Sequence, residues 1–345
     1  MQALRVFLER LLINLENTDL IIIGAGPTGL FATFCAGLRE IDSITLEGSD
    51  TYGGQITELY PEKMVYDMQG IAKIKGAQLA EQMLQQAKLF KKKIVFSSNV
   101  TDIIPTQDKK FIIEVNGVQT YTSKSVLLCT GIGHFEPNKL NVDGENEYVG
   151  KGVFYTVKSQ DDFKGKKVII IGGGDSAFDY ANQIVDTAES VVIAQHNNVI
   201  KAAEEVVDAA KNNPKIKILL NTVIEGISGD GKTIKSIKLK DSASGKEYQQ
   251  DFDAVIAAIG HKVNPDMFKS VKLENDGRYI KTDFSYKTNV DGVYAAGDAA
   301  SINNEPRFAL LAVGGAEAYI AINNIKKYLS PSSGLFGEHS SNIKL

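Results

Sequence analysis

A glycine-rich turn close to the N-terminus has the residue types and the spacing that hold the pyrophosphate of a dinucleotide. It follows the apolar run 19–23 and places glycine at Gly24, Gly26 and Gly29. The first glycine permits a tight turn, the second lets a pyrophosphate approach the backbone, and the third allows a helix to pack closely on a strand. Glu47 follows about 20 residues later, where a carboxylate accepts hydrogen bonds from both ribose hydroxyls. The combination predicts a dinucleotide site, the alternative being a similar turn without a ligand.

A second turn of this kind lies near the middle of the chain. After the apolar run 167–171 it reads Gly-Gly-Gly-Asp-Ser-Ala, with Ala177 at the third glycine position, where such turns tolerate alanine. The next strand ends at Ala194-Gln195, so a ribose-binding carboxylate is missing here. The turn predicts a second dinucleotide, whose expected contacts are Gly172, Gly174, Asp175 and Ser176.

A third signal lies at residues 292–298, where an apolar strand ends in Gly-Asp ahead of an apolar helix from about Leu310. A carboxylate at such a strand end can bond the ribitol chain of a flavin, which makes Asp298 a candidate; a helix-capping aspartate is the alternative. Two nucleotide sites in one chain favour electron relay. One site would hold FAD permanently and the other would exchange a nicotinamide, with the cofactors carrying the redox chemistry.

The elements that must position these residues repeat along the chain. Strand, glycine turn, helix and strand run through 19–23, 30–38 and 43–47, and the same order returns about 148 residues later. Strands are also expected at 110–115, 121–128, 232–241 and 246–252.

Two apolar strands that end in glycine, at 121–131 and 254–260, are interpreted as crossing points between domains. The predicted fold class is α/β, with two Rossmann-like, three-layer nucleotide-binding domains, the second inserted into the first. Residues 1–134 and 263–345 would form the FAD-binding domain, with an irregular tail after Leu329, and 135–262 the NAD(P)H-binding domain.

Composition excludes several classes of protein. The 345 residues are 43% hydrophobic and 23% charged, which is ordinary for a globular protein and too apolar for a disordered one. The net charge of −4 argues against nucleic acid as a partner. Two distant cysteines, Cys35 and Cys129, exclude a disulfide scaffold and suit a cytoplasmic location. The four histidines lack metal-ligand spacing, so no metal is expected.

No apolar run has the length of about 18 residues that a membrane helix needs, so no membrane association is expected. The first 18 residues have apolar side chains at helical spacing, interrupted by Glu9 and Arg10, which argues against a signal peptide. They predict an extra amphipathic helix or a mobile leader, the alternative being a segment that packs on a partner subunit.

From about Asp19 onward the chain resembles the homodimeric ferredoxin–NADP reductases of the thioredoxin-reductase-like flavoproteins. Four stretches carry the resemblance: GAGPTGLFATFCAGLRE, YGGQITELYPEKMVYDMQGIAKIKG, IIIGGGDSAFDYA and GVYAAGDAA. The second is the most specific, because glycine motifs are widely shared. The resemblance implies FAD in the first and last segments, NADPH in the inserted module, a homodimer, and ferredoxin or a flavodoxin-like acceptor as partner.

The resemblance also implies site residues. Gly24, Gly26, Gly29 and Glu47 would hold the adenosine diphosphate half of FAD, and Asp298 the ribitol. Gln55, Tyr60 and Asp67 would lie about the isoalloxazine, with Tyr60 stacked on one face and His339, followed by Ser340, over the other. The remaining implied cofactor contacts are Val100 for FAD and His196 and Lys201 for the nicotinamide nucleotide.

The chain departs at two places from the pattern of the flavoproteins that it resembles. A Cys-x-x-Cys precedes the second glycine turn in thioredoxin reductases, but residues 154–159 here contain no cysteine, which excludes dithiol relay to thioredoxin. The family marks NADP with a His-Arg-Arg cluster and a further arginine. Here the stretch runs from Gln195 through His196 to Lys201 without arginine, so NADH use is also expected.

The predicted function is an oxidoreductase of the ferredoxin–NADP(+) reductase type, which transfers electrons between NAD(P)H and ferredoxin through bound FAD. It needs no acid–base catalytic residues of its own. One alternative is an NAD(P)H-dependent flavin or quinone reductase. Another is a non-catalytic flavin-binding redox sensor, which two intact glycine motifs disfavour.

Overall fold

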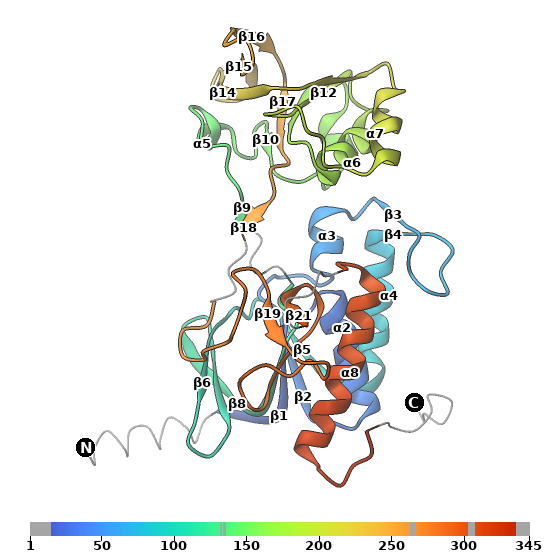
Figure 1. Cartoon of the computed structure of the whole chain (residues 1–345), viewed down its shortest axis with the longest axis vertical. Helices are drawn as coiled ribbons and strands as arrows, with labels where there is room; N and C mark the ends of the chain where they lie inside the picture. Colours follow the sequence, from blue (N-terminus) through green and yellow to red (C-terminus); the bar gives the residue numbers. More distant parts are fainter. Residues whose placement is uncertain (1–14, 132, 134–135, 263–266, 303–307, 336–345) are drawn as a thin grey trace, which may run out of the picture. The chain divides into compact units, whose positions relative to one another are not determined.

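The chain divides into two compact units, each with its own sheet and core (Figure 1). The computed structural model describes residues 15–131, 133, 136–262, 267–302 and 308–335. Unit 1 comprises Met1–His134 with Val263–Leu345, and unit 2 is Phe135–Lys262. These are the bounds at which the sequence analysis divided the chain. The N-terminal helix or leader expected over the first 18 residues lies almost wholly outside the described residues.

Unit 1 is built on a seven-stranded sheet in the order β5-β2-β1-β8-β7-β6, with β20 paired to the end of β8. The strands that flank the first glycine turn, β1 and β2, run parallel, whereas β6, β7 and β8 form an antiparallel meander. Asn116 and Gly117 both have positive φ in the tight turn between β7 and β8, a combination typical of hairpin turns. The strands are β1 (Glu16–Ile23), β2 (Ser43–Leu46), β5 (Lys93–Val95), β6 (Val100–Pro105), β7 (Phe111–Val115), β8 (Val118–Leu128) and β20 (Val293–Ala295).

Alternate residues of β1 enter two different cores. Leu20 and Ile22 pack against helices α2 and α8, whereas Ile21 and Ile23 pack against β6, β7 and residues 268–300. Helix α2 begins at Pro27, three residues earlier than predicted, because proline suits the first position of a helix. The helices are α2 (Pro27–Leu38), α3 (Gln55–Leu59), α4 (Gly76–Ala87), α8 (Leu311–Leu329) and the short η1 (Lys88–Phe90) and η3 (Gly297–Ala299). Two small sheets pair β3 (Met64–Val65) with β4 (Ile74–Lys75) and β19 (Ile280–Thr282) with β21 (Ala300–Ile302).

Unit 2 has three layers around a five-stranded parallel sheet in the order β10-β17-β11-β12-β13. Val168 and Ile170 of β11 pack on the helix side, and Ile169 and Ile171 pack against a three-stranded antiparallel sheet on the other face. The elements are β10 (Val153–Phe154), β11 (Lys167–Ile171), β12 (Ser190–Ala194), β13 (Ile216–Leu219), β17 (Ala254–Ala257), the antiparallel β14 (Thr222–Gly229), β15 (Ile234–Asp241) and β16 (Glu247–Asp251), the pair β9 (Glu136–Pro137) and β18 (His261–Lys262), and the helices α5 (Glu145–Tyr148), α6 (Asp175–Ile184), α7 (Glu204–Lys211) and η2 (Gln160–Phe163).

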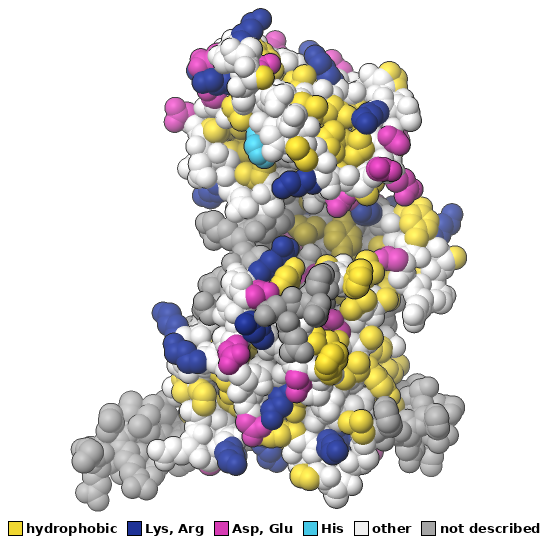
Figure 2. Space-filling view, viewed as in Figure 1, with side chains coloured by type: hydrophobic (Ala, Val, Ile, Leu, Met, Phe, Trp, Pro, Cys, Tyr) yellow, Lys and Arg dark blue, Asp and Glu magenta, His cyan; other side chains and the backbone are white. Residues whose placement is uncertain are grey.

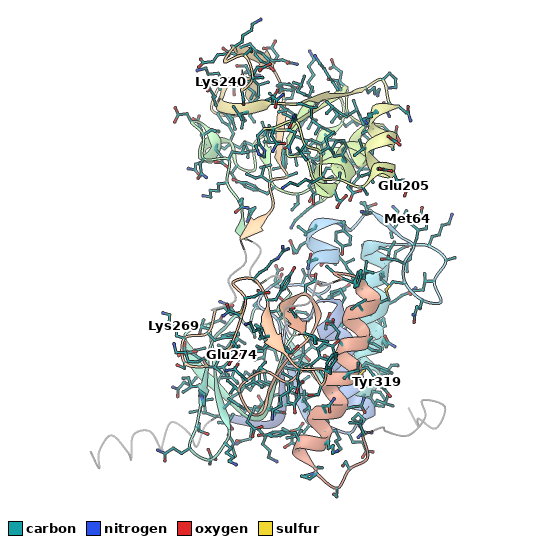
Figure 3. The ribbon with its side chains drawn as sticks, in the orientation of Figure 1. Met64, Glu205, Lys240, Lys269, Glu274 and Tyr319 are labelled. Atoms are coloured by element: carbon teal, nitrogen blue, oxygen red, sulfur yellow. The ribbon has the colours of Figure 1, made fainter. Side chains whose placement is uncertain are left out.

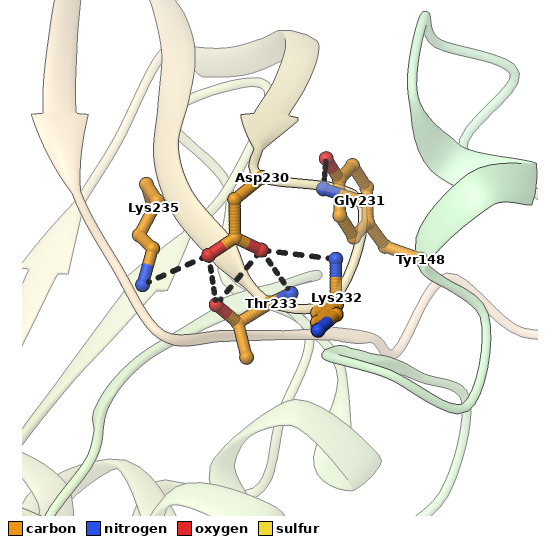
Figure 4. Close-up of polar contacts among 6 residues, drawn as sticks. All are labelled: Tyr148, Asp230, Gly231, Lys232, Thr233 and Lys235. Atoms are coloured by element: carbon orange, nitrogen blue, oxygen red, sulfur yellow. Dashed lines mark hydrogen bonds and ion pairs between the residues drawn. The ribbon is translucent and has the colours of Figure 1, made fainter.

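The turn between β14 and β15 is held by one carboxylate (Figure 4). Backbone N–H groups of Lys232 and Thr233 donate to Asp230 Oδ1 at 2.9 and 2.8 Å, and these bonds lower the pKa of Asp230 to about 2. The N–H of Gly231 donates to the Tyr148 hydroxyl at 3.1 Å, which ties the turn to α5. Together the two units confirm the predicted α/β class. Among the described helices, none is both long and apolar enough to cross a membrane.

Candidate functional site

The first glycine turn connects β1 to α2, and its three glycines have different surroundings. A Cβ at Gly24 would overlap the carbonyl oxygen of Cys129, and a Cβ at Gly29 would overlap that of Gly24. Close packing of the protein itself therefore requires both glycines. A Cβ at Gly26 would meet only the Cα of Gly54, at an ordinary 3.8 Å, and its φ of −70° suits any residue. The start of α2 is thus open beside Gly26, as an anion-binding helix N-terminus requires.

Glu47 lies beside this opening because its side chain binds the turn. The N–H of Ala25 donates to Glu47 Oε2 at 2.6 Å, and the N–H of Ser49 donates to Oε1 at 2.8 Å. Both bonds fix the carboxylate next to Gly26. A carboxylate offers about four acceptor positions, so these two bonds leave capacity for ribose hydroxyls.

Three segments distant in the sequence bring polar side chains together near this turn. Gln55 begins α3, and its Nε2 donates to Asp298 Oδ2 at 3.0 Å. Tyr60 follows α3; burial raises its pKa to about 12, and the nearby carboxylates of Asp298 and Asp67 add to the effect. Gly54 approaches Gly26 so closely that a Cβ on Gly54 would lie 3.0 Å from the Gly26 Cα. Of the predicted isoalloxazine neighbours, Gln55 is therefore bonded to Asp298, and Tyr60 lies near the carboxylates of Asp298 and Asp67.

Of the other three predicted FAD contacts, one is described by the structure and two lie outside the described residues. Val100 begins β6, where it pairs with Val115 and packs against the apolar core of the sheet. His339 and Ser340 lie outside the described residues. The carbonyl of Gly334, near the end of the described chain, accepts a hydrogen bond from Arg39 Nη2 at 2.7 Å.

Sequence reasoning missed the residue that joins the segments, Thr28. A Cβ at Gly297 would overlap the Thr28 side chain, and one at Gly314, in the first turn of α8, would lie 2.6 Å from Thr28 Oγ1. The starts of α2 and α8 and the turn before Asp298 therefore meet at this threonine. A glycine inside an apolar helical run, as at Gly314, is the sequence signal that could have indicated close packing.

The second glycine turn repeats this pattern in unit 2. Gly172 has a φ of +148°, and a Cβ there would overlap the carbonyl oxygen of Ala258. No atom lies within 4 Å of a Cβ built on Gly174, so the start of α6 is open. Asp175 Oδ1 accepts the N–H of Ala203 at 2.8 Å, which joins the start of α6 to the start of α7. Ser176 is exposed in the first turn of α6.

The loop after β12 is fastened to this turn by its backbone. The N–H of Lys201 donates to the carbonyl oxygen of Gly173 at 2.8 Å. Gln195 is only 4% exposed, and its Nε2 donates to the carbonyl oxygen of Val199 at 2.8 Å. Gln195 therefore stabilises the loop from inside, whereas His196 is exposed.

Three carboxylates lie close to this loop, at the starts of α6 and α7. Glu204 and Glu205 are exposed at the start of α7, three and four residues after Lys201, and Asp175 is bonded to the same helix start. Glu205 is labelled in Figure 3. Unit 2 contains no arginine. The predicted nucleotide site of unit 2 therefore offers little positive charge to a phosphate monoester.

Both cysteines are buried, which makes their thiols unreactive. Burial raises the pKa of Cys35 to about 12, and burial together with the Glu317 carboxylate raises that of Cys129 far above its usual range. Because only the thiolate is nucleophilic, iodoacetamide at pH 8 should label neither thiol in the native protein. It should label both after unfolding in guanidinium, as counted by mass spectrometry. A native protein that gains a label as fast as free cysteine would contradict this burial.

Comparisons with known proteins agree with the geometry. The sequence pattern of the pyridine nucleotide-disulphide oxidoreductase family matches residues 18–318. A protein of Picrophilus torridus named ferredoxin–NADP reductase is 49% identical over 96% of this chain and 100% of its own length. Ferredoxin–NADP reductase 2 of Sulfolobus acidocaldarius is 38% identical over 95% of this chain and 98% of its own.

Solved structures of thioredoxin reductases share the fold. The enzyme from T. acidophilum has a TM-score of 0.80 and 30% identity, over 90% of this chain and 98% of its own. That of Lactococcus lactis also has a TM-score of 0.80, at 24% identity over 91% of this chain and 99% of its own. The predicted architecture of two Rossmann-like domains is thereby confirmed.

Proposed function

Because this chain belongs to the pyridine nucleotide-disulphide oxidoreductase family, we propose that it passes electrons between NADPH and ferredoxin through bound FAD. The single observation that supports this most is the 49% identity to a ferredoxin–NADP reductase over nearly the whole of both chains. FAD is suited to the task because it exchanges a hydride with a nicotinamide and single electrons with an iron–sulfur protein. The protein supplies binding and orientation.

Unit 1 fits FAD. The open helix start at Gly26 would take the pyrophosphate, and Glu47 the adenosine ribose. Asp298, held by Gln55, would accept hydrogen bonds from the ribitol, and Tyr60 would lie against the flavin ring. These groups would reach from the adenosine ribose to the flavin ring, a span that supports FAD over a smaller nucleotide.

Unit 2 fits a nicotinamide nucleotide. Gly174 leaves space at the start of α6 for a pyrophosphate, and Asp175 and Ser176 begin the helix that faces it. His196 and Lys201 lie on the loop fastened to the same turn and would be the neighbours of the adenosine ribose.

The purified protein should be yellow, and anaerobic NADPH should bleach it. It should reduce ferredoxin but not thioredoxin, because both cysteines are single and buried. The choice of electron acceptor is measured by steady-state rates at one NADPH concentration, with ferredoxin, free flavin, a quinone or thioredoxin as the acceptor. Turnover with free flavin or quinone but not with ferredoxin would favour the alternative function, and a flavin that NADPH leaves oxidised would favour the sensor.

We expect the protein to be a cytoplasmic homodimer. Hydrophobic side chains gather over α8 (Figure 2), where Tyr319 and Ile320 are exposed, and Phe308 and Leu310 are exposed just before it. Exposed apolar surface of this kind is typical of an interface. Sedimentation should give twice the chain mass of 37.5 kDa.

Deletion of residues 336–345 tests the proposed role of His339 and Ser340 over the flavin. The shortened protein should keep its FAD but lose electrons to oxygen faster, because one face of the ring would be uncovered. The deletion keeps Gly334 and its bond to Arg39, so the end of α8 is unchanged. Oxygen consumption and ferredoxin turnover are the readouts; if neither changes, the tail is not part of the site.

A further inference from the structure

Helix α8 carries a buried carboxylate, Glu317, that the function proposed above does not use. Its side chain is 5% exposed, and Ala318, Ala321 and Ile322 around it enter the core of unit 1. Burying a carboxylate is unfavourable unless hydrogen bonds compensate for the lost water. Its position among apolar residues therefore calls for a bonding partner.

One partner is the turn that precedes Asp298. The backbone N–H of Gly297 donates to Glu317 Oε2 at 2.7 Å. Gly297 is itself buried and has a φ of +71°, in the left-handed region that favours glycine. Its Cα faces Thr28, so the turn is enclosed by α2 on one side and by α8 on the other. A buried N–H at this point would be costly if it had no acceptor.

The turn determines where Asp298 lies. Asp298 follows Gly297 directly, and its Oδ2 accepts the hydrogen bond from Gln55 Nε2 at 3.0 Å. A change in the Gly297 backbone would rotate the next peptide unit and move this carboxylate. Two hydrogen bonds thus link α8 to α3 through the turn at Gly297 and Asp298.

We propose that Glu317 is a positioning residue of the flavin site: by accepting the Gly297 N–H it holds Asp298 against Gln55. The inference rests on the proposed function only in naming FAD as the ligand of Asp298. Glu317 acts through the turn and needs no contact with the cofactor.

A double-mutant cycle on FAD affinity tests this. Glu317→Met removes the acceptor while keeping the side-chain length, and should weaken FAD binding to the apo-protein by about tenfold to a hundredfold, the range for a lost charge-assisted bond. Asp298→Ala should weaken it at least as much. Because Glu317 acts through Asp298, the double variant should bind within about threefold of Asp298→Ala alone.

Two further variants separate positioning from general stability. Glu317→Gln keeps an oxygen acceptor and should bind FAD within about threefold of wild type. Asn323→Ala is the matched control, since Asn323 lies on the same helix, is equally buried, and donates to the carbonyl of Tyr319 at 2.7 Å. It should lower the melting temperature of the apo-protein without changing FAD affinity.

Several results would overturn the inference. The first is a double-mutant cycle in which the two losses of FAD affinity simply add. The second is a Glu317→Gln variant that binds FAD as weakly as Glu317→Met, and the third is an Asn323→Ala variant that loses as much FAD affinity. If the Met variant does not fold, hydrogen exchange in the wild-type apo-protein decides. In the absence of FAD, the amide hydrogen of Gly297 should be protected from exchange with solvent. Unprotected exchange at this amide would contradict the proposal. A wild-type protein that cannot be loaded with FAD would refute the proposed function instead.

Discussion

A Gly26→Ala protein should fold as well as wild type and be purified without its flavin. The added Cβ meets nothing closer than 3.8 Å, and alanine adopts this backbone conformation freely, so apo-protein stability should change by less than about 1 kcal/mol. The same Cβ occupies the space through which a pyrophosphate would reach the start of α2. Two charge-assisted bonds lost at roughly 1.5–3 kcal/mol each correspond to more than about a hundredfold in FAD affinity.

Circular dichroism melts of the apo-proteins and FAD titration by fluorescence separate the two effects. Gly29→Ala is the contrasting variant, because its Cβ would overlap the Gly24 carbonyl and should prevent folding. Gly174→Ala is the matched variant in unit 2, where a Cβ also meets open space; it should keep its FAD and lose bleaching by NADPH. A Gly26→Ala protein that retains FAD with wild-type affinity would show that the pyrophosphate lies elsewhere.

The wild-type protein should use NADPH and NADH with kcat/KM values within about tenfold of each other. The 2′-phosphate that distinguishes them is usually bound by arginine, whose planar fork matches phosphate oxygens, and unit 2 has none. Lys201 supplies one fixed charge, while Glu204 and Glu205 follow it at the start of α7. Two missing charge-assisted bonds amount to roughly 3–6 kcal/mol, enough to remove most discrimination.

The loop suggests which variants would restore selectivity. His196 and Asn198 are exposed, so the double variant His196→Arg, Asn198→Arg should raise NADPH preference at fixed salt. Gln195→Arg is the control: this side chain is buried and bonded within the loop, so its replacement should lower stability without improving selectivity. A wild-type preference for NADPH above about a thousandfold, roughly 4 kcal/mol, would mean that the phosphate binds elsewhere.

The fold class was predictable because its signals are local. The runs 19–23 and 167–171 each precede a glycine turn, and both form central strands, β1 and β11. Two strands of the antiparallel layer, β15 and β16, were also predicted. Their partner β14 was not, nor was the packing of all three on the parallel sheet, because that layer forms only through contacts between distant segments.

The candidate site was less accessible to sequence reasoning. Thr28 and Glu317 are ordinary helix residues in the sequence, and they acquire a role only where α8 meets the turn at Gly297. Gln195 begins the stretch in which the family carries its NADP-marking residues, but the structure turns this side chain inward, since Gly173 has no side chain to oppose it. Which cofactor atoms the remaining residues contact stays a prediction.

The insertion of unit 2 imposes an order on synthesis. Unit 2 is one continuous segment whose ends pair as β9 and β18, so all its strands exist once Lys262 has been made. Unit 1 at that stage still lacks β20 and α8, and with them Asp298 and Glu317. Domains fold as units while the chain is made from its N-terminus. The inserted domain, second in position, can therefore fold first, and the proposed flavin site is complete only after α8 has been made.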